Sequence, residues 1–417
     1  MRFENLNNLL KEDNFFSFNI EFLDSHIKNI VLTCDASYAQ ISMASLVTCG
    51  FILSHGGIKN TSLYFCDLSN SGTGKSFNIT LQMKLLLNHI EKLQENLQLT
   101  YDGDEVKRFH NMHRGKITVA ALNQCIKTVR AQLLVTDELG LLMSKGSDII
   151  DEVTKLYGSE VTSLSITKGE MPNIKNIVPV AFSFMGATTL SYFGGKKSIM
   201  NELLGGFINR QLLAYNIILK KPEEINSIFK DTLDYESSNK RAIELFDFAK
   251  KCNLVFKYSL ESEELQLEFK KEVQYLKVKY HDMGTEFGNF YSRVEQNLQT
   301  IMNILHILKC FEQNNYQIEI NVITTKTAID FFKKVAFKEI DKLINYLSDG
   351  ELLEREEKQL IKIKEFVTEY NNKHSSMPKI RDISLKTRLS KDEILTLTKG
   401  YLELTSGSTV LKYCDKF

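Results

Sequence analysis

The sequence predicts an α/β protein whose parallel sheet lies between helical segments, and three observations support this. Strand and helix signals alternate over residues 61–220, as a parallel sheet with crossover helices requires. Residues 1–60 have the apolar periodicity of helices, and residues 221–345 are dominated by long, charged amphipathic helices. Residues 346–417 open with a helix over 351–370 and close with a compact helix-turn-helix pattern. We therefore expect four segments with these bounds.

Composition is that of a soluble chain with ample core. The 417 residues are 43% hydrophobic and 25% charged, which predicts two or three domains. Lysine plus arginine equals aspartate plus glutamate, at 52 each, so no overall basic field indicates a nucleic-acid or membrane partner. The seven cysteines are scattered and odd in number, which favours a reducing cytoplasm over disulfides or zinc.

Neither the N-terminus nor the most apolar stretch near it indicates a membrane. The first five residues, Met1 to Asn5, do not resemble a signal peptide. The apolar stretch over residues 36–53 is interrupted by serine, glutamine and threonine, so we expect a buried helix there and no membrane span.

A glycine-rich loop, Ser-Asn-Ser-Gly-Thr-Gly-Lys-Ser, occupies residues 69–76. It follows an apolar strand candidate at 62–66 and precedes a helix predicted over 77–93, which is the context of a phosphate-binding P-loop. Backbone N–H groups and the positive end of the helix dipole would surround the phosphates. Lys75 would reach the β- and γ-phosphates and Ser76 would bind Mg²⁺. The predicted cofactors are ATP and Mg²⁺, and the predicted binding residues are Ser71, Gly72, Thr73, Gly74, Lys75, Ser76 and Phe77.

The loop departs from the P-loop motif at its first position. The motif has glycine where this chain has Ser69, so a residue with a Cβ must make that turn. A Ser/Gly/Thr surface loop that happens to contain Gly-Lys-Ser is the alternative interpretation.

A second apolar run, residues 132–138, ends in two carboxylates about sixty residues beyond the P-loop. Hydrolysis of a phosphoanhydride needs one carboxylate near the metal and one that positions or deprotonates the attacking water. We expect Asp137 to bind the metal and Glu138 to act on the water. The alternative is a helix N-terminus capped by Asp137.

Two further polar residues follow in an order that suits ATP hydrolysis. A strand candidate at 178–185 is followed by Thr188, which would contact the γ-phosphate or the attacking water; a threonine-rich turn is the alternative. Arg210 lies in the apolar frame of residues 205–213 and would stabilise transition-state charge in a neighbouring subunit. That role implies an oligomer. The alternative is a purely structural arginine, which the same local sequence would fit.

Four stretches resemble a known family: Ser-Gly-Thr-Gly-Lys-Ser at 71–76, the acidic pair at 137–138, Gly-Ala-Thr-Thr at 186–189 and Gly-Phe-Ile-Asn-Arg at 206–210. Over about residues 20–345 the chain resembles the YfjI-like P-loop proteins of bacterial mobile elements, which are related to primase-helicases. That family is similar to the AAA+ helicases of the MCM and superfamily III type. The resemblance implies an AAA+-like core with an all-α lid, and a ring-shaped oligomer such as a hexamer.

Within this wider group, two more positions acquire expected roles. Residues 291–298 resemble the lid helix that carries the sensor-2 arginine, which makes Arg293 a nucleotide contact, and residues 323–332 resemble the final lid helix. Residues 161–172 alternate polar and apolar and then turn, which predicts a hairpin. MCM-like helicases direct a lysine of such a hairpin at DNA, and Lys168 matches it. On the residues alone, a solvated surface position is the more common interpretation for an arginine on a charged helix, such as Arg293, and for a lysine at a hairpin tip, such as Lys168.

The C-terminal segment has the outline of a winged helix. Ser390 and Glu393 have capping-box spacing at the start of a helix predicted to run to about residue 402. The stretch is locally basic, and Arg388 and Lys391 are candidate DNA contacts. Such a domain also serves as a protein-contact module.

These features predict an AAA+-like ATPase that couples ATP hydrolysis to work on single-stranded or forked DNA, as a helicase or replication-initiation motor of a mobile element. The alternative is a nucleotide-dependent switch or defence ATPase that binds a protein partner and unwinds nothing. A small-molecule kinase fits less well, because sensor-like and finger-like residues follow the acidic pair where an acceptor site would be needed.

Overall fold

The structure is a computed structural model. It describes residues 16–84, 112–114, 117–119, 122, 131–144, 148–158, 181–216, 235–252, 256–283, 285–348, 351–387, 389, 391, 394–395, 398, 402–404 and 411–413. By packing, the chain separates into two compact units, Met1–Asp341 and Lys342–Phe417, which are described separately.

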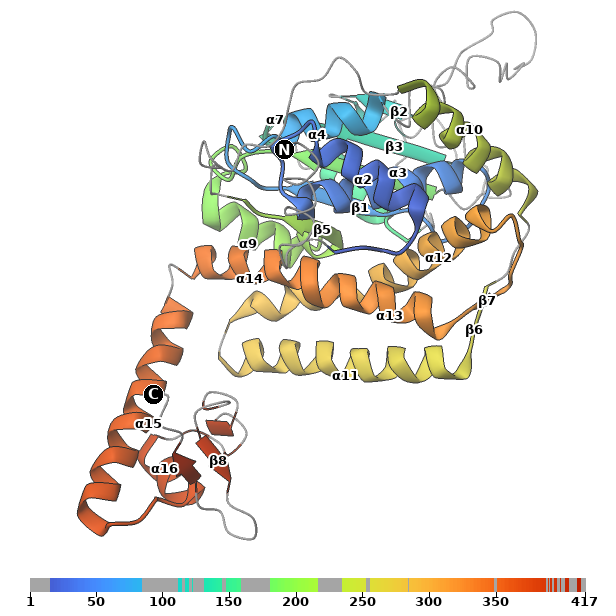
Figure 1. Ribbon diagram of the computed structural model, residues 1–417. Helices are drawn as coiled ribbons and strands as arrows, with labels where there is room; N and C mark the ends of the chain where they lie inside the picture. Colours follow the sequence, from blue (N-terminus) through green and yellow to red (C-terminus); the bar gives the residue numbers. More distant parts are fainter. Residues whose placement is uncertain are drawn as a thin grey trace, which may run out of the picture. The chain divides into compact units, whose positions relative to one another are not determined.

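A five-stranded parallel sheet forms the centre of the first unit (Figure 1). Its order is β2-β3-β4-β1-β5, and its strands are β1 (Tyr64–Asp67), β2 (Met112–Arg114), β3 (Ala131–Thr136), β4 (Ala181–Ala187) and β5 (Gln211–Ala214). Every residue of β1, β3 and β5 is buried, as expected for a parallel sheet covered on both faces. The α/β class predicted from the sequence is confirmed.

The order places β4 between β1 and β3. Cys66 of β1 pairs with Gly186 of β4, which pairs with Thr136 of β3, so the three strands end in almost the same row. The loops that follow these strands consequently emerge side by side at the carboxyl edge of the sheet. This arrangement positions the candidate site.

Helix α3 (Tyr38–His55) is buried along almost its whole length and contacts β1, β3, β4 and β5. Its N-terminus is a capping box, in which Ser37 and Gln40 satisfy each other's backbone N–H groups. Its polar side chains are satisfied locally, as where Thr48 Oγ1 donates to the carbonyl of Ala44 at 2.9 Å. The buried helix predicted over 36–53 is confirmed. Within the described residues, no helix has the length and apolarity needed to span a membrane.

The remaining helices of this unit fall into two groups. Those before or between the sheet strands are α2 (Glu21–Val31), α4 (Lys75–Gln82), α7 (Leu139–Ser144), α8 (Asp148–Leu156), α9 (Gly195–Gly205) and the 3₁₀ turn η3 (Ile208–Arg210). Those after the sheet are α10 (Tyr235–Lys251), α11 (Leu260–Asp282), η5 (Glu286–Tyr291), α12 (Val294–Glu312), α13 (Val322–Phe331) and the π-helical turn η6 (Phe332–Ala336). Helix α14 (Phe337–Leu347) follows and contains the boundary between the two units. The short parallel pair β6 (Lys257–Tyr258) and β7 (Glu319–Ile320) precedes α11 and α13.

The helices after the sheet form successive layers. α12 contacts α3, α13 contacts α12, and α11 contacts α13, so α11 is the outermost of these helices (Figure 1). The helices expected at 291–298 and 323–332 are present: residues 294–298 form the start of α12, and α13 spans Val322–Phe331.

The second unit contains α15 (Glu351–His374), α16 (Ile380–Thr387) and an antiparallel strand pair, β8 (Leu402–Leu404) with β9 (Leu411–Tyr413). Its core comprises Ile363, Val367, Ile380, Ile383, Leu389 and Ile394. Helix α15 confirms the helix predicted at 351–370. Lys391 is exposed, whereas Arg388, Ser390 and Glu393 lie outside the described residues.

Candidate nucleotide-binding site

The glycine-rich loop connects β1 to α4, as the sequence predicts. Gly72 and Gly74 have φ of 83° and 76°, which side chains disfavour, and α4 begins at Lys75. A Cβ at position 74 would lie 2.6 Å from the backbone nitrogen of Ala36. Gly74 is thus required both by its backbone conformation and by the close approach of the preceding chain.

Backbone donors are available at this turn. Within the described part of the chain, no hydrogen bond involves the backbone N–H groups of residues 72–76, and Ser71, Gly72 and Ser76 are exposed. These donors sit at the N-terminus of α4, where the helix dipole favours an anion. The donor set therefore fits a phosphate group.

The Lys75 side chain lies over its own loop. Its ammonium group donates to the carbonyl oxygens of Ser69 at 3.1 Å and Asn70 at 3.0 Å, and burial lowers its pKa. An ammonium group has three donors, so Lys75 can exchange these carbonyl contacts for phosphate oxygens.

Ser69 stands where the P-loop motif has its first glycine, and the structure explains the substitution. Its backbone φ is not positive, so a side chain is tolerated. Its fully buried hydroxyl oxygen accepts hydrogen bonds from Gln40 Nε2 at 3.2 Å and from the backbone N–H of Asn216 at 2.9 Å. Ser69 thus links the loop to α3 and to the end of β5.

Asp67, the last residue of β1, completes this buried network. Its carboxylate accepts from Gln40 Nε2 at 2.7 Å and from the backbone N–H of Ser69 at 3.1 Å. Burial raises the pKa of Asp67 to about 6, although these hydrogen bonds and the charge of Lys75 oppose the shift. Gln40 therefore holds both the strand end and the loop in place.

The segment before α3 also contacts the loop. Cys34 Sγ donates to the carbonyl oxygen of Gly74 at 3.4 Å, and Cys34 and Ala36 are buried. Residues 34–36 therefore form one wall of the site. They were not predicted from the sequence, although the Ser37–Gln40 capping box could have revealed where α3 begins.

The two predicted carboxylates follow the neighbouring strand, β3. Asp137 and Glu138 are exposed, and the backbone N–H of Glu138 donates to Thr136 Oγ1 at 3.3 Å. Because Thr136 shares a row with Gly186 and Cys66, both carboxylates lie at the same edge of the sheet as the P-loop.

Thr188 follows β4, between the other two strand ends. Its backbone N–H donates to the carbonyl of Asp67 at 2.9 Å, and its hydroxyl donates to the carbonyl of Thr189 at 3.3 Å. The structure thus brings Lys75, the acidic pair and Thr188 to the ends of three adjacent strands.

Arg210 lies at the opposite edge of the sheet. It precedes Gln211, which pairs with Tyr64 at the start of β1, whereas the P-loop follows the end of β1. The four residues of β1 separate the two edges by about 13 Å at about 3.3 Å per residue. Arg210 consequently does not belong to the P-loop site of its own chain.

Arg210 instead lies beside Tyr157 and Arg293. Its guanidinium carbon is 5.8 Å from the centre of the Tyr157 ring, and its pKa is lowered by burial and by the charge of Arg293. The Tyr157 hydroxyl donates to Asn297 Oδ1 of α12 at 2.7 Å. The structure therefore brings Arg293 to Arg210 and not to the P-loop of its own chain.

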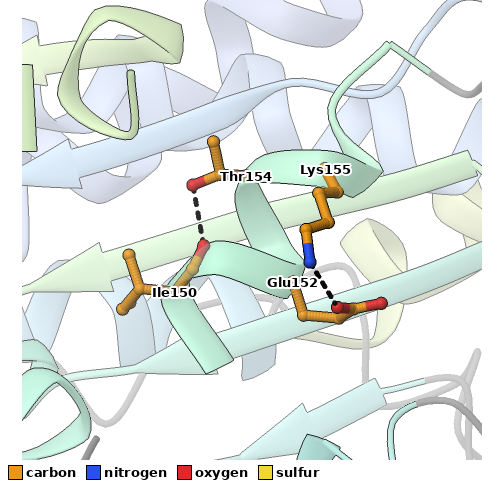
Figure 2. A network of polar contacts seen from close by, with 4 residues as sticks. All are labelled: Ile150, Glu152, Thr154 and Lys155. Carbon is orange, nitrogen blue, oxygen red and sulfur yellow. Dashed lines mark hydrogen bonds and ion pairs between the residues drawn. The ribbon is translucent and has the colours of Figure 1, made fainter. Parts of the chain in front are cut away.

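Helix α8 carries the chain back from the acidic pair to this second edge. Figure 2 shows two contacts along it: Thr154 Oγ1 donates to the carbonyl oxygen of Ile150 at 2.7 Å, and Lys155 Nζ lies 3.4 Å from Glu152 Oε2. Tyr157 follows the last turn of α8 and packs against Tyr64 of β1. The predicted hairpin at 161–172, with Lys168, lies outside the described residues.

No protein-family model matches this sequence, and a comparison with curated proteins finds no significant relative. The geometry of the residues themselves is therefore the basis for a functional assignment.

Proposed function

We propose that the chain is an AAA+-like P-loop ATPase that uses ATP hydrolysis to do work on DNA. The observation that carries the proposal is the convergence of three loops, after β1, β3 and β4, at one edge of a parallel sheet. In open α/β sheets, ligands bind beyond the carboxyl ends of the strands. Each of the three loops supplies a residue type that phosphoanhydride hydrolysis needs.

The P-loop would hold the triphosphate. Its unused backbone donors and Lys75 supply positive potential, while Ser76 and Asp137 are the oxygen ligands suited to Mg²⁺. A bound magnesium ion would neutralise charge on the phosphate oxygens. Lys75 would transfer its ammonium hydrogen bonds from the loop carbonyls to the phosphates.

Glu138 and Thr188 would act on the attacking water. Glu138 is exposed and follows the metal-binding candidate directly, so it suits the role of accepting a proton or orienting water. The hydroxyl of Thr188 now points to a backbone carbonyl and can rotate to donate to a γ-phosphate oxygen.

Arg210 and Arg293 would complete the site of a neighbouring subunit. Neither lies at the P-loop of its own chain, and the two are close enough for the charge of Arg293 to lower the pKa of Arg210. A polyphosphate offered by a second copy would relieve this repulsion. This arrangement favours an oligomeric ATPase, in keeping with the ring expected from the family resemblance.

The DNA-directed part of the proposal comes from the resemblance to MCM and superfamily III helicases and from the second unit. In that unit, α15 and α16 are followed by an antiparallel strand pair, which suits a winged helix. Lys168, Arg388 and Lys391 are the proposed DNA contacts.

The test is the ATPase rate with and without single-stranded or forked DNA at low salt. We expect DNA to stimulate the wild type, Lys75→Ala to abolish nucleotide binding, and Glu138→Gln to retain binding while losing hydrolysis. Lys84→Ala, an exposed lysine beyond the end of α4, is the matched control and should behave as wild type. Hydrolysis that survives Lys75→Ala would refute the site; hydrolysis indifferent to DNA would favour a nucleotide-dependent switch.

A mixing experiment tests the role of Arg210 in trans. Lys75→Ala and Arg210→Ala should each be inactive alone, but a mixture should regain activity. A mixed interface can pair an intact P-loop from one subunit with an intact Arg210 from the other. A mixture as inactive as its components would show that Arg210 does not act across subunits.

A further inference from the structure

The outermost helix of the first unit, α11, exposes apolar side chains along one line. Leu260, Leu267 and Val278 retain 76%, 54% and 44% of their accessible surface. At 100° per residue these three side chains project within an arc of about 20°. That arc lies opposite the buried residues of α11, which are Ser262, Phe269, Val273 and Tyr280. We call Leu260, Leu267 and Val278, together with Glu264 and Lys271 between them, the α11 stripe.

Charge is distributed unevenly along this helix. The first half, residues 260–268, has four glutamates and no lysine or arginine. The second half, residues 269–279, has four lysines and one glutamate, Glu272, which forms an ion pair with Lys333 at 2.6 Å. The helix is therefore acidic at its start and basic towards its end.

We propose that the α11 stripe binds the α11 stripe of a second copy of this chain, with the two helices antiparallel. A two-fold axis that crosses the stripe at the level of residue 269 along the helix places Leu260 of each copy against Val278 of the other. It also places Lys271 of each copy within reach of Glu264 and Glu268 of the other. This pairing covers the exposed leucines and brings opposite charges together, and each contact occurs twice because the interface is isologous.

The charge pattern selects this orientation over the alternative. A parallel pair in register would also bring leucine to leucine, but it would place Glu264 against Glu264 and Lys271 against Lys271. Like charges in facing positions are destabilising, whereas opposite charges are favourable. Leu260 and Val278 are about 27 Å apart along the helix, so the interface is a single helix pair and the dimer is weak.

The pairing is independent of the proposed ATPase function, because it uses no residue of the P-loop site and needs no nucleotide. In nucleotide-free buffer, we expect the full chain to sediment as a dimer at about 100 µM and as a monomer at about 1 µM. A chain that stays monomeric at the higher concentration would overturn the proposal. The stripe would then be exposed to solvent, covered by another part of the chain or bound by a different protein.

Charge reversal tests the partner and its orientation together. Variant A carries Glu264→Lys and Glu268→Lys, and variant B carries Lys271→Glu. Each alone should raise the dimer dissociation constant at least tenfold, because like charges then face each other. An equimolar mixture of A and B should dimerise as strongly as wild type. Glu244→Lys, at an exposed glutamate of α10, is the matched control and should leave dimerisation unchanged.

Two outcomes would contradict the proposal even if a dimer forms. Dimerisation that is insensitive to variants A and B would place the interface elsewhere. Cysteine cross-linking checks the orientation: a mixture of Leu260→Cys and Val278→Cys should form disulfide-linked dimers, whereas Leu260→Cys alone should not. Cross-linking of Leu260→Cys to itself would show a parallel pair. The five native cysteines in the described residues are all buried, which limits background reaction.

Discussion

Restoring the consensus glycine in the P-loop, by Ser69→Gly, should destabilise the protein. The Ser69 hydroxyl accepts hydrogen bonds from Gln40 Nε2 and from the Asn216 backbone, and the side chain has no exposed surface. Losing the two hydrogen bonds costs about 2 kcal/mol, at about 1 kcal/mol each. The greater freedom of glycine in the unfolded chain adds about 0.5–1 kcal/mol. The expected loss in the free energy of unfolding is therefore about 3 kcal/mol.

Hydrogen exchange measured on peptides from β1 and β5 suits this prediction, because the chain has two units and global unfolding is not expected to be two-state. A loss of about 3 kcal/mol corresponds to exchange roughly 150-fold faster where exchange requires opening of the sheet. Ser71→Gly, at an exposed position of the same loop, is the matched control and should change exchange less than about fivefold. Equal protection in Ser69→Gly and wild type would refute the structural role assigned to the Ser69 hydroxyl.

Three further predictions follow from the same region. Gly74→Ala should lose nucleotide binding and melt at lower temperature than Gly195→Ala, since both have positive φ but only position 74 leaves no space for a Cβ. The folded pKa of Asp67, about 6, lies above its ordinary value of 3.8, so the folded state binds more protons between these values and stability falls as pH rises from about 4 to about 6. The fall is about 3 kcal/mol at 1.36 kcal/mol per pH unit, and it should appear in the hydrogen exchange of β1 peptides in wild type but not in Asp67→Asn. Tyr157→Phe should lower local stability by about 1 kcal/mol through the lost bond to Asn297, which corresponds to roughly fivefold faster hydrogen exchange in α12 peptides, without changing nucleotide affinity.

Much of the fold was predictable because its signals are local. The strand, loop and helix around the P-loop have distinct apolar patterns, and the apolar run before Asp137 is a strand in the structure. The order of the strands was not predictable from these patterns. Whether β4 lies beside β1 or at an edge depends on long-range pairing, which no local periodicity encodes.

The candidate site was predicted in part for the same reason. Lys75, Asp137, Glu138 and Thr188 follow strands in sequence, so a sheet with parallel neighbours brings them together. Gln40 was missed because its contacts to Asp67 and Ser69 cross from a helix that precedes the sheet. Its role appears only once α3 is packed on the strands.

The placement of Arg210 and Arg293 bears on how the proposed ATPase must assemble. A buried four-residue strand separates Arg210 from the P-loop, so no change of side-chain rotamer brings it to the phosphates of its own chain. Adjacent guanidinium groups repel each other, and within the described residues the buried Nε of Arg210 has no hydrogen-bond partner. Stacking on Tyr157 offsets only part of that cost. An anion supplied by another subunit would offset the remainder. The ATPase rate per subunit should therefore rise with protein concentration in wild type, whereas Arg210→Ala should be inactive at every concentration; a wild-type rate per subunit that is independent of concentration would refute the role in trans.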